Sequence, residues 1–383
     1  MKFSKVCVTI ILAGFVLESC IKEEAPNAEC DIEKAYVKVN NPSTLFYSLA
    51  DTAVNILSTD STVTFSVRRT ADLSAVSPMF ELTKGATISP ASGSVHDFSK
   101  NPVIYTVTSQ DKTWNRIYKV AFNKVIRTVN DTICYDFEHY SLESSSQKYY
   151  VWQHEEEDGT LSNIWATANA GFGLSMSTAK PEDYPTVPVT DGYEGSAVKL
   201  TTCSTGPFGV IANRRLAAGN MYLGSFDLSS ALTNTLHATH FGVVCDREPV
   251  RFTGYYKYVP GPKFQDKNGN ILANKTDSAS VYAVFYRNQD ADGNAITLYG
   301  DNIKTSPQII AIADCGYLKP TDNWAKFDVT FNYQSDIDAD LLLNRGYNLA
   351  VVFSSSKEGD QYSGAIGSML YIDKVKVICT KEQ

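Results

Sequence analysis

The chain has 383 residues, of which 43% are hydrophobic and 20% are charged. This composition supplies enough apolar side chains for packed cores and excludes a largely disordered protein, and the length corresponds to two or three domains at ~100–200 residues each. Lys and Arg total 34 against 42 Asp and Glu, which gives a formal net charge of −8. This balance argues against a nucleic-acid-binding protein, which would need a basic face, and allows a neutral ligand such as a glycan.

The amino-terminal segment has the pattern of a secretory signal. Lys2 and Lys5 precede an apolar run over residues 6–17, which is too short to span a bilayer as a permanent helix. The run ends in Leu-Glu-Ser-Cys, which resembles the bacterial lipobox. The sequence therefore predicts a signal peptide over residues 1–19 and lipid attachment at Cys20, where two acyl chains would give stable anchoring. The alternative is an ordinary cysteine that follows a conventional cleavage site.

A polar tether is predicted for residues 20–33. Its Lys-Glu-Glu sequence at residues 22–24 resembles the surface-export signal of Bacteroidota lipoproteins, and a solvated tether is the alternative interpretation. Together with the lipid at Cys20, this resemblance implies a protein that is anchored in the outer membrane and exposed on the cell surface. No later segment holds the ~18 consecutive apolar residues that a membrane-spanning helix needs.

Short β-branched runs separated by turn residues follow over residues 34–126. They include residues 35–39, 63–67 and 103–108. About seven such runs in ~95 residues favour an immunoglobulin-like sandwich. The stretch from Gly85 to Phe122 also resembles the bacterial Ig-like domains found at the amino end of surface lipoproteins.

The remaining residues, 127–383, alternate polar and apolar side chains and contain no convincing amphipathic helix. In residues 250–258, Phe252 and Tyr256 share one strand face, whereas Arg251, Tyr255 and Lys257 share the other. Strands that are apolar on one face only form two-sheet sandwiches, and the length favours a jelly roll over a second Ig-like domain. The predicted fold is therefore all-β, with an Ig-like sandwich followed by a larger jelly-roll β-sandwich.

Five segments in a fixed order carry a family resemblance. They are FE at residues 137–138, WATANA at 165–170, FTGYYKY at 252–258, NWAKF at 323–327 and GSMLYID at 367–373. This order, behind an Ig-like module, resembles the putative carbohydrate metabolism domain of exported Bacteroidota proteins. The resemblance implies a jelly roll of the kind found in carbohydrate-binding modules, and a role in glycan handling without proven catalysis.

A sugar-binding site needs aromatic faces for the C–H surfaces of the sugar and polar groups for its hydroxyls. Arg251, Tyr255 and Lys257 supply this mixture on one strand face, and an ordinary outer strand face is the alternative. Trp165 and Asn169 lie in a small-residue segment that is predicted as a loop where backbone can approach a ligand. The alternative places Trp165 in the core. These five residues form the predicted ligand-binding site, which includes no catalytic residue and no metal ligand.

Catalysis is a second interpretation, because glycosidases use two carboxylates about 5–10 Å apart. Asp136 and Glu138 share one face of a predicted strand, and residues 155–158 form an acidic run of the kind that solvated loops also carry. No cofactor is predicted. A structural calcium ion shared by Glu138 and Asp373 is expected only by analogy with jelly-roll binding modules.

The sequence thus predicts a surface lipoprotein whose jelly roll binds a polysaccharide or oligosaccharide. Its expected partners are the glycan, the outer-membrane lipid and a glycan-uptake complex, with no nucleic acid. A glycoside hydrolase or lyase of sandwich fold is the first alternative, and a structural or adhesion protein with a protein partner is the second. Six cysteines could pair in an exported chain or remain isolated buried thiols: Cys30, Cys134, Cys203, Cys245, Cys315 and Cys379.

Overall fold

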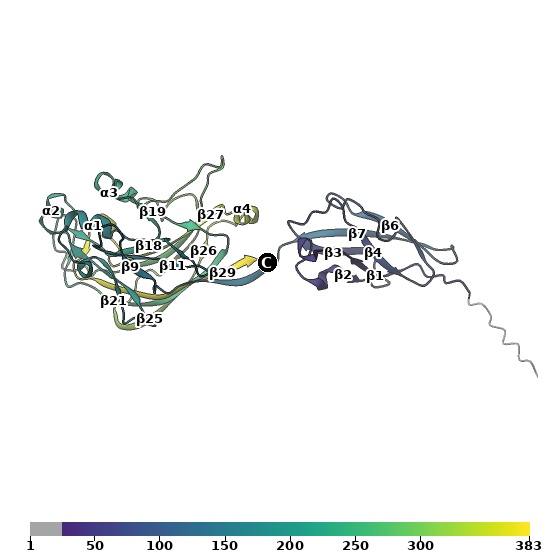
Figure 1. Ribbon diagram of the computed structural model, residues 1–383, viewed down its shortest axis with the longest axis horizontal. Helices are drawn as coiled ribbons and strands as arrows, with labels where there is room; N and C mark the ends of the chain where they lie inside the picture. Colours follow the sequence, from purple (N-terminus) through teal and green to yellow (C-terminus); the bar gives the residue numbers. More distant parts are fainter. Residues whose placement is uncertain (1–24) are drawn as a thin grey trace, which may run out of the picture. The chain divides into compact units, whose positions relative to one another are not determined.

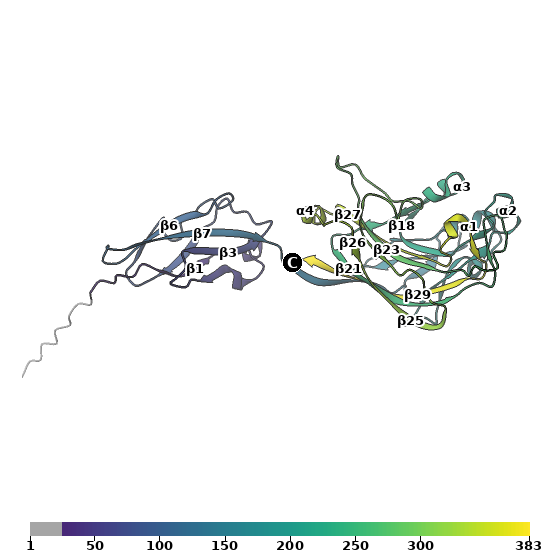
Figure 2. The ribbon, with the colours of Figure 1, turned by 180° about the vertical axis from the view of Figure 1, so that it is seen from behind.

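The computed structural model describes residues 25–383, so the predicted signal peptide and Cys20 lie outside the described residues. The chain divides into two compact units, one up to Arg127 and one from Thr128 to Gln383. Figures 1 and 2 draw the first unit in purple and blue and the second in teal, green and yellow. Within residues 25–383, no helix has the length and hydropathy to cross a membrane.

The first unit is a sandwich of two β-sheets. Its strands are β1 (Ile32–Val37), β2 (Ala53–Asn55), β3 (Thr62–Arg68), β4 (Pro78–Leu82), β5 (Thr87–Ser89), β6 (Val103–Thr108) and β7 (Asn115–Val125), with short 3₁₀ turns η1 (Pro42–Thr44) and η2 (Leu49–Thr52). One sheet has the order β2-β1-β4 and the other the order β3-β7-β6-β5. Strands β3 and β7 run parallel, and the other pairs are antiparallel.

The core of the first unit follows from period-two alternation. In β3, Val63, Phe65 and Val67 are fully buried, and the residues between them are more exposed, because successive side chains of a strand point to opposite faces. Phe65 stacks on Phe122 with ring centroids 4.8 Å apart. Residues 27–33, which the sequence places in the tether, bind to this unit. For example, the carbonyl of Asn27 accepts from the backbone N–H of Asp111.

Two antiparallel sheets face each other in the second unit. The six-stranded sheet has the order β14-β15-β29-β21-β25, with β8 also paired to β29, and the eight-stranded sheet has the order β13-β18-β27-β23-β24-β26, with β19 on β18 and β20 on β27. The strands of the six-stranded sheet are β8 (Thr128–Tyr135), β14 (Thr186–Val189), β15 (Ala197–Thr201), β21 (Glu248–Val259), β25 (Thr321–Thr330) and β29 (Met369–Glu382). Those of the eight-stranded sheet are β13 (Trp165–Ala166), β18 (Asn220–Phe226), β19 (Thr239–Phe241), β20 (Val243–Val244), β23 (Ser280–Arg287), β24 (Ile309–Asp314), β26 (Asn332–Tyr333) and β27 (Tyr347–Ser354).

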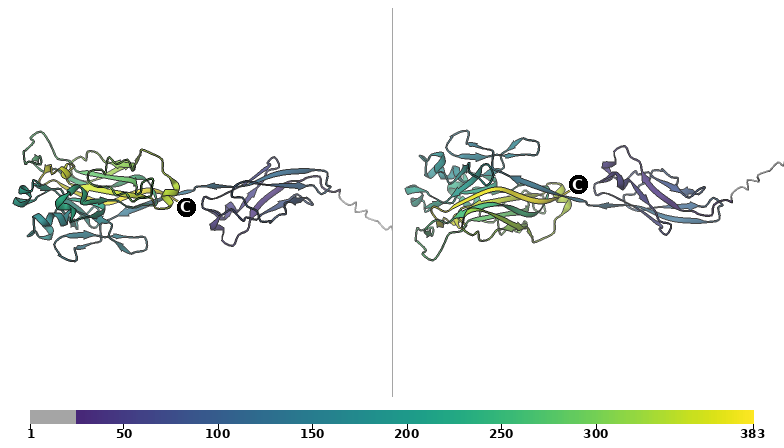
Figure 3. Two further views of the ribbon diagram at one scale, coloured as in Figure 1. Left: turned by 90° about the horizontal axis from the view of Figure 1, so that it is seen from above. Right: turned by 90° about the horizontal axis from the view of Figure 1, so that it is seen from below.

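Short elements decorate this sandwich, as Figure 3 shows from above and below. The two-stranded pairs are β9 (Tyr140–Leu142) with β10 (Tyr150–Trp152), β11 (His154–Glu155) with β12 (Leu161–Ser162), β16 (Cys203–Ser204) with β17 (Leu216–Ala217), and β22 (Phe264–Gln265) with β28 (Gly364–Ala365). The helices are α1 (Asn169–Ser175), α2 (Gly206–Ile211), α3 (Ser230–Thr233) and α4 (Ala339–Leu343), with 3₁₀ turns η3 (Pro181–Asp183), η4 (Thr235–His237) and η5 (Gly359–Gln361). In Figure 1, α1, α2 and α3 gather at one end of the second unit.

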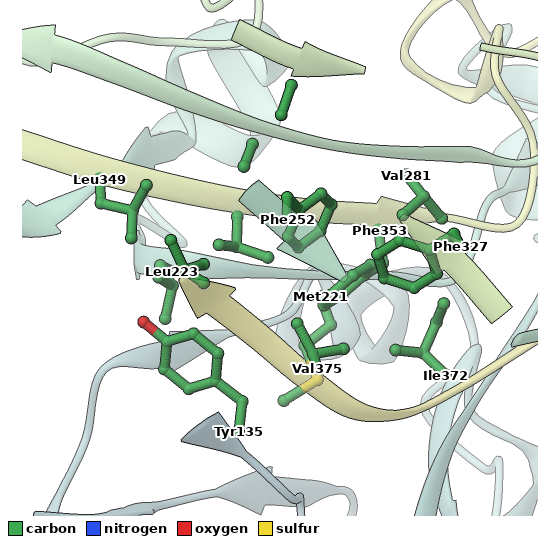
Figure 4. Close-up of a cluster of buried hydrophobic side chains, with 14 of the residues drawn as sticks. Tyr135, Met221, Leu223, Phe252, Val281, Phe327, Leu349, Phe353, Ile372 and Val375 are labelled. Carbon is green, nitrogen blue, oxygen red and sulfur yellow. The ribbon is translucent and has the colours of Figure 1, made fainter. Parts of the chain in front are cut away.

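The main core fills the space between the two sheets (Figure 4). Phe252 from β21 and Phe327 from β25 meet Phe353 and Val281 from the eight-stranded sheet. Every residue of β23 except the last is buried, because the outer face of this sheet is also covered. A second apolar cluster on that outer face includes Tyr222, Tyr282 and Val352. A strand that is buried on both faces is apolar along its whole length.

The predicted all-β sandwich fold is confirmed, and the structure adds helices that the sequence did not reveal. Each of the four α-helices has only four to seven residues, too short for a periodic apolar pattern to show. Helix α1 replaces the loop predicted after Trp165. Its Gly171 and Gly173 allow close packing, since a Cβ atom at either position would come within 3.2 Å of Phe226 or 3.0 Å of Tyr184.

All six cysteines among the described residues are free thiols. Burial raises the pKa of Cys203 and Cys245 to about 11 and that of Cys315 to about 12. These thiols therefore remain protonated near neutral pH and are poor nucleophiles. Of the six, Cys134 is the exposed one.

Candidate functional site

A cavity of about 720 Å³ lies against the outer face of the eight-stranded sheet. Its floor is formed by side chains of neighbouring strands, with Tyr222 on β18, Phe241 on β19, Tyr282 on β23 and Val352 on β27. Tyr222 and Phe241 pack at 4.8 Å between ring centroids. Ser280 and Ser354 add hydroxyl groups near the ends of β23 and β27. The floor is therefore aromatic with polar groups beside it.

The walls come from segments that are distant in the sequence. They are α1, α2, the chain from Ala212 to Ala218, α3 with η4, residues 300–305, and η5. Contacts between the walls hold them together. Arg214 donates to the carbonyl of Ala231 at 2.8 Å and lies 5.9 Å from the ring of Tyr362, while the Tyr362 hydroxyl donates to Thr235 at 2.9 Å.

Tyr362 adopts a left-handed conformation at the end of η5, with φ of 54°. A bulky residue rarely occupies this region, and the cost of roughly 1–3 kcal/mol is tolerated where the surroundings fix the residue. Here the contacts to Thr235 and Arg214 fix it. The rim of the cavity is therefore held in one arrangement before any ligand arrives.

Charged side chains line one part of the cavity. Lys304 lies 3.9 Å from the centre of the Tyr282 ring and forms an ion pair with Asp314 at 2.8 Å. Burial raises the pKa of Asp360, and Lys304 opposes this effect. Asp301 accepts from His237 at 3.1 Å. The cavity thus combines apolar ring faces, three cations and two carboxylates: Arg214, Lys304, Lys357, Asp301 and Asp360.

Two exposed aliphatic or aromatic side chains stand at the cavity rim. Phe208 on α2 is 60% exposed and Leu174 on α1 is 43% exposed, although both line the cavity. Large apolar side chains held open to solvent around a hollow are typical of ligand sites. This arrangement suits a ligand that has apolar C–H faces and many hydroxyls.

The sequence-predicted strand face lies on the other sheet. Tyr255 stacks on Tyr193, with ring centroids 3.6 Å apart and an interplanar angle of 10°. Lys257 lies over the ring of Trp324 at 4.7 Å. Arg251 is further along β21, where it binds both carboxylate oxygens of Asp328. Tyr255 and Lys257 therefore lie in one aromatic cluster, whereas Arg251 forms an ion pair with Asp328.

Trp165 and Asn169 are placed differently from the sequence prediction. Trp165 is only 8% exposed and packs in the main core against Tyr135 and Phe353. Asn169 is 1% exposed, and its amide both donates to and accepts from the backbone of Thr186. Neither side chain has a surface for a ligand, so both belong to the structural framework, and the alternative that the sequence left open for Trp165 applies.

The predicted carboxylate pair is also rearranged. Strand β8 ends at Tyr135, and Phe137 has a φ of 60°, so Asp136 and Glu138 do not share a strand face. Glu138 accepts from the backbone N–H of Ser196, and buried Asp373 accepts from that of Glu194 at 3.0 Å. These carboxylates hold a turn. Residues 25–383 contain no group of three or more His, Cys, Asp or Glu side chains that could hold a metal ion.

The acidic run at residues 155–158 is engaged by neighbouring side chains or backbone groups. Glu155 pairs with His139 at 2.9 Å and Glu157 with Arg247 at 2.9 Å. Ser162 donates to Glu156. Asp158 caps the turn between β11 and β12 by accepting from Thr160. These acids stabilise a hairpin, as solvated acidic runs commonly do.

The five site residues predicted from the sequence do not line the cavity on the eight-stranded sheet, although the small-residue segment around Asn169 supplies Ala168 and Gly171 to its wall. Phe208 follows Gly206 and Pro207, and Arg214 precedes a second Arg in a segment rich in small residues. The only local signal was a Gly-Pro pair, which marks a turn. The walls assemble from segments more than 190 residues apart, and a pattern within one segment does not reveal such an assembly.

Comparison with protein families gives two matches. The model described as putative carbohydrate metabolism domain matches residues 136–378. The model described as SGBP, N-terminal, matches residues 44–121. A comparison with curated proteins gives no match.

Two structures from Bacteroides species are among the solved structures that resemble this chain. A putative glycoside hydrolase from Bacteroides thetaiotaomicron VPI-5482 is 36% identical, with a TM-score of 0.60, over 94% of this chain and 99% of that one. A putative glycoside hydrolase from Bacteroides vulgatus ATCC 8482 is 35% identical, with a TM-score of 0.59, over 64% of this chain and 97% of that one. The sequence-based recognition is thereby confirmed, and the chain belongs to the putative carbohydrate metabolism domain family.

Proposed function

We propose that the second unit binds an oligosaccharide, or the end of a polysaccharide chain, in the cavity on the eight-stranded sheet. The observation that carries this proposal is the cavity itself, which joins an aromatic floor to charged and hydroxyl-bearing walls. Its volume of about 720 Å³ lies within the ~300–1,000 Å³ range of small-molecule sites. Sugar C–H faces would pack on Phe208 and Leu174, which are exposed at the rim, and sugar hydroxyls would bond to Arg214, Lys304 and Asp360.

The family comparisons support a carbohydrate ligand. The family is associated with carbohydrate metabolism, and the first unit matches a module named for SGBP, the surface glycan-binding proteins. The walls already contact one another without ligand, so little ordering entropy would be lost on binding. A preformed site of this kind suits a binding protein that captures glycan and passes it to an uptake complex.

Replacing Phe208 by Ala should weaken glycan binding about tenfold, because a stacking face at the cavity rim is lost. The measurement is calorimetric titration of residues 25–383 with oligosaccharides identified by a polysaccharide panel. Ile211→Ala is the matched control, since Ile211 is on the same helix, is 83% exposed and lies outside the cavity lining. Equal affinities for the Phe208 and Ile211 variants would contradict the proposal, as would the absence of any glycan ligand.

Hydrolysis is the second candidate function, because two carboxylates, Asp301 and Asp360, line the same cavity. The raised pKa of Asp360 is the property a general acid needs, since its carboxyl then keeps a proton to higher pH. The two Bacteroides relatives described above are both named as a putative glycoside hydrolase. The test measures whether the protein releases new reducing ends from a glycan that it binds. If the Asp360→Asn variant still binds the glycan but no longer releases reducing ends, the protein is a hydrolase. Binding without product supports the binding protein.

The proposal includes lipid anchoring at Cys20 in the outer membrane, with the two units at the cell surface. In cells, Cys20→Ala should move the protein from the membrane fraction to the soluble fraction and remove the acyl mass from its amino-terminal peptide. Two acyl chains are enough to hold a protein stably on a membrane. The Cys20→Ala protein would carry no acyl chain and would therefore lose this anchor. Cys30→Ala, ten residues later, is the control and should remain membrane-bound. Membrane retention of the Cys20 variant would contradict lipid anchoring at this residue.

A further inference from the structure

The outer face of the six-stranded sheet carries a second cluster of rings, here called the aromatic corner. It consists of Tyr193, Tyr255, Trp324 and Tyr371, with Lys257 among them. Tyr193 covers Tyr255 and is itself 46% exposed. The ring of Trp324 is 6.2 Å from that of Tyr193 and at 80° to it. Tyr193 thus offers an open ring face, and Trp324 stands at right angles to it.

The turn that carries Tyr193 is built to hold this position. Buried Asp373 accepts from the backbone N–H of Glu194, and Glu138 accepts from that of Ser196 through both carboxylate oxygens, at 3.1 and 3.0 Å. Gly192 donates to the carbonyl of Gly195 at 2.9 Å. A Cβ atom at Gly192 would come within 2.8 Å of Asp373. Charge-assisted bonds of this kind fix the loop, so the ring of Tyr193 is preorganised.

The outer sheet face around the aromatic corner carries more cations than carboxylates, although the whole chain is acidic with a net charge of −8. Register places Tyr371 of β29 between Lys199 of β15 and Lys257 of β21, in one row across three strands. The side chains on this outer face include five cations, Lys199, Arg251, Lys257, Lys326 and Lys376, and three carboxylates that are not buried, Glu248, Asp328 and Glu382.

These three carboxylates do not neutralise all five cations. Asp328 pairs with Arg251 and Lys326. Within the described part of the chain, no carboxylate lies within ion-pair distance of the Nζ atoms of Lys199, Lys257 or Lys376. Lys257 instead lies 4.7 and 4.9 Å from the ring centres of Trp324 and Tyr371. Cations held beside open rings attract a ligand that is both anionic and able to stack.

We propose that the aromatic corner is a second glycan site, separate from the cavity, and that it binds an acidic polysaccharide. A sugar ring stacks on Tyr193 against Trp324, and its carboxylate or sulfate groups bind Lys257 and the neighbouring lysines. An open strand face admits a chain at any point along its length, whereas the cavity is bounded by walls on several sides. The acidic ligand class rests on the proposed carbohydrate function of this unit, and the site itself rests on the geometry of the corner.

The test is affinity electrophoresis of residues 25–383 in gels with matched polysaccharide pairs. Polygalacturonate is compared with its methyl ester, and dextran sulfate with dextran, so the pairs separate carboxylate from sulfate. We expect retardation by an acidic member and not by its neutral parent, with a retardation constant that falls as salt rises. Tyr193→Ala and Lys257→Gln should each weaken binding about tenfold. Tyr193→Phe should retain most of it, because the stacking face remains.

Three controls make the outcome decisive. Lys119→Gln removes the same charge from the exposed surface of the first unit and should change nothing. Phe208→Ala should leave this site intact, so failure of the cavity proposal and failure of this one are distinguishable. Equal loss in the Lys119 and Lys257 variants would overturn the proposal, since it would indicate diffuse charge attraction. Equal retardation by neutral and acidic members, or binding only to anionic lipid vesicles, would also overturn it.

Discussion

Asp277→Ala should destabilise the second unit by about 3–5 kcal/mol, because the carboxylate of Asp277 is 2% exposed and bound by several donors. Its Oδ2 atom accepts from the hydroxyls of Ser356 and Ser368 and from the backbone N–H of Ala365, all within 2.8 Å. Each buried donor left without a partner costs roughly 1–3 kcal/mol. The network extends to Thr202, which lies 2.6 Å from Ser356.

The measurement is thermal unfolding of residues 25–383, followed by calorimetry and by tryptophan fluorescence. For a unit of this size the melting temperature should fall by roughly 10 °C. Asp290→Ala is the matched control. Asp290 accepts three hydrogen bonds, against four for Asp277, but within an exposed turn, so its variant should shift the transition by only a fraction of that amount. Similar shifts for the two variants would show that burial is not what makes Asp277 important.

Trp165→Ala should lower the free energy of unfolding of the second unit by about 3–5 kcal/mol, which is typical for removing a buried tryptophan side chain. Trp165 packs on Tyr135 at 5.1 Å, Phe137 at 5.3 Å and Phe353 at 6.1 Å between ring centroids. These rings come from strands or turns of both sheets, so the cavity left by the indole cannot close without moving the sheets together.

Binding measured below the unfolding transition distinguishes a core residue from a site residue. Folded Trp165→Ala protein should bind glycan with the affinity of the unaltered chain, although it melts earlier. Tyr317→Ala is the control for size, because Tyr317 is 63% exposed and its loss should have little effect on stability. If the Trp165→Ala variant keeps normal stability but loses glycan binding, Trp165 is a ligand-binding residue and not a core residue.

The parts of the fold that follow from local pattern could be predicted from the sequence. The alternation of β21 assigns Phe252 to the core and Tyr255 to the outer face, and both lie there. The same alternation cannot show what covers Tyr255. Its partner Tyr193 is 62 residues earlier, in a turn held by Asp373 and Glu138. Long-range partners depend on topology, which a single strand does not encode.

Trp165 and Asn169 show a second limit. The glycines in the segment after Trp165 predict a loop, because glycine disfavours helices by about 1 kcal/mol relative to alanine. In the structure, packing against Phe226 and Tyr184 requires small residues in α1, and this tertiary requirement outweighs helix propensity. The cavity could not be predicted for the same reason. Its walls are short segments that only the tertiary fold brings together.

Strand β29 gives the second unit a particular order of assembly. It joins β15 and β8 along one edge and β21 along the other, although it is the last strand along the chain. During synthesis, strands β1 to β7 of the first unit can pair as soon as they emerge. By contrast, β15, β8 and β21 keep unpaired edges until β29 is made, more than 100 residues after β21. The second unit should therefore fold late and slowly, as sheets dominated by non-local pairing do. In that interval its exposed strand edges are the part of the protein at greatest risk of aggregation, and chaperones that bind them would protect the chain.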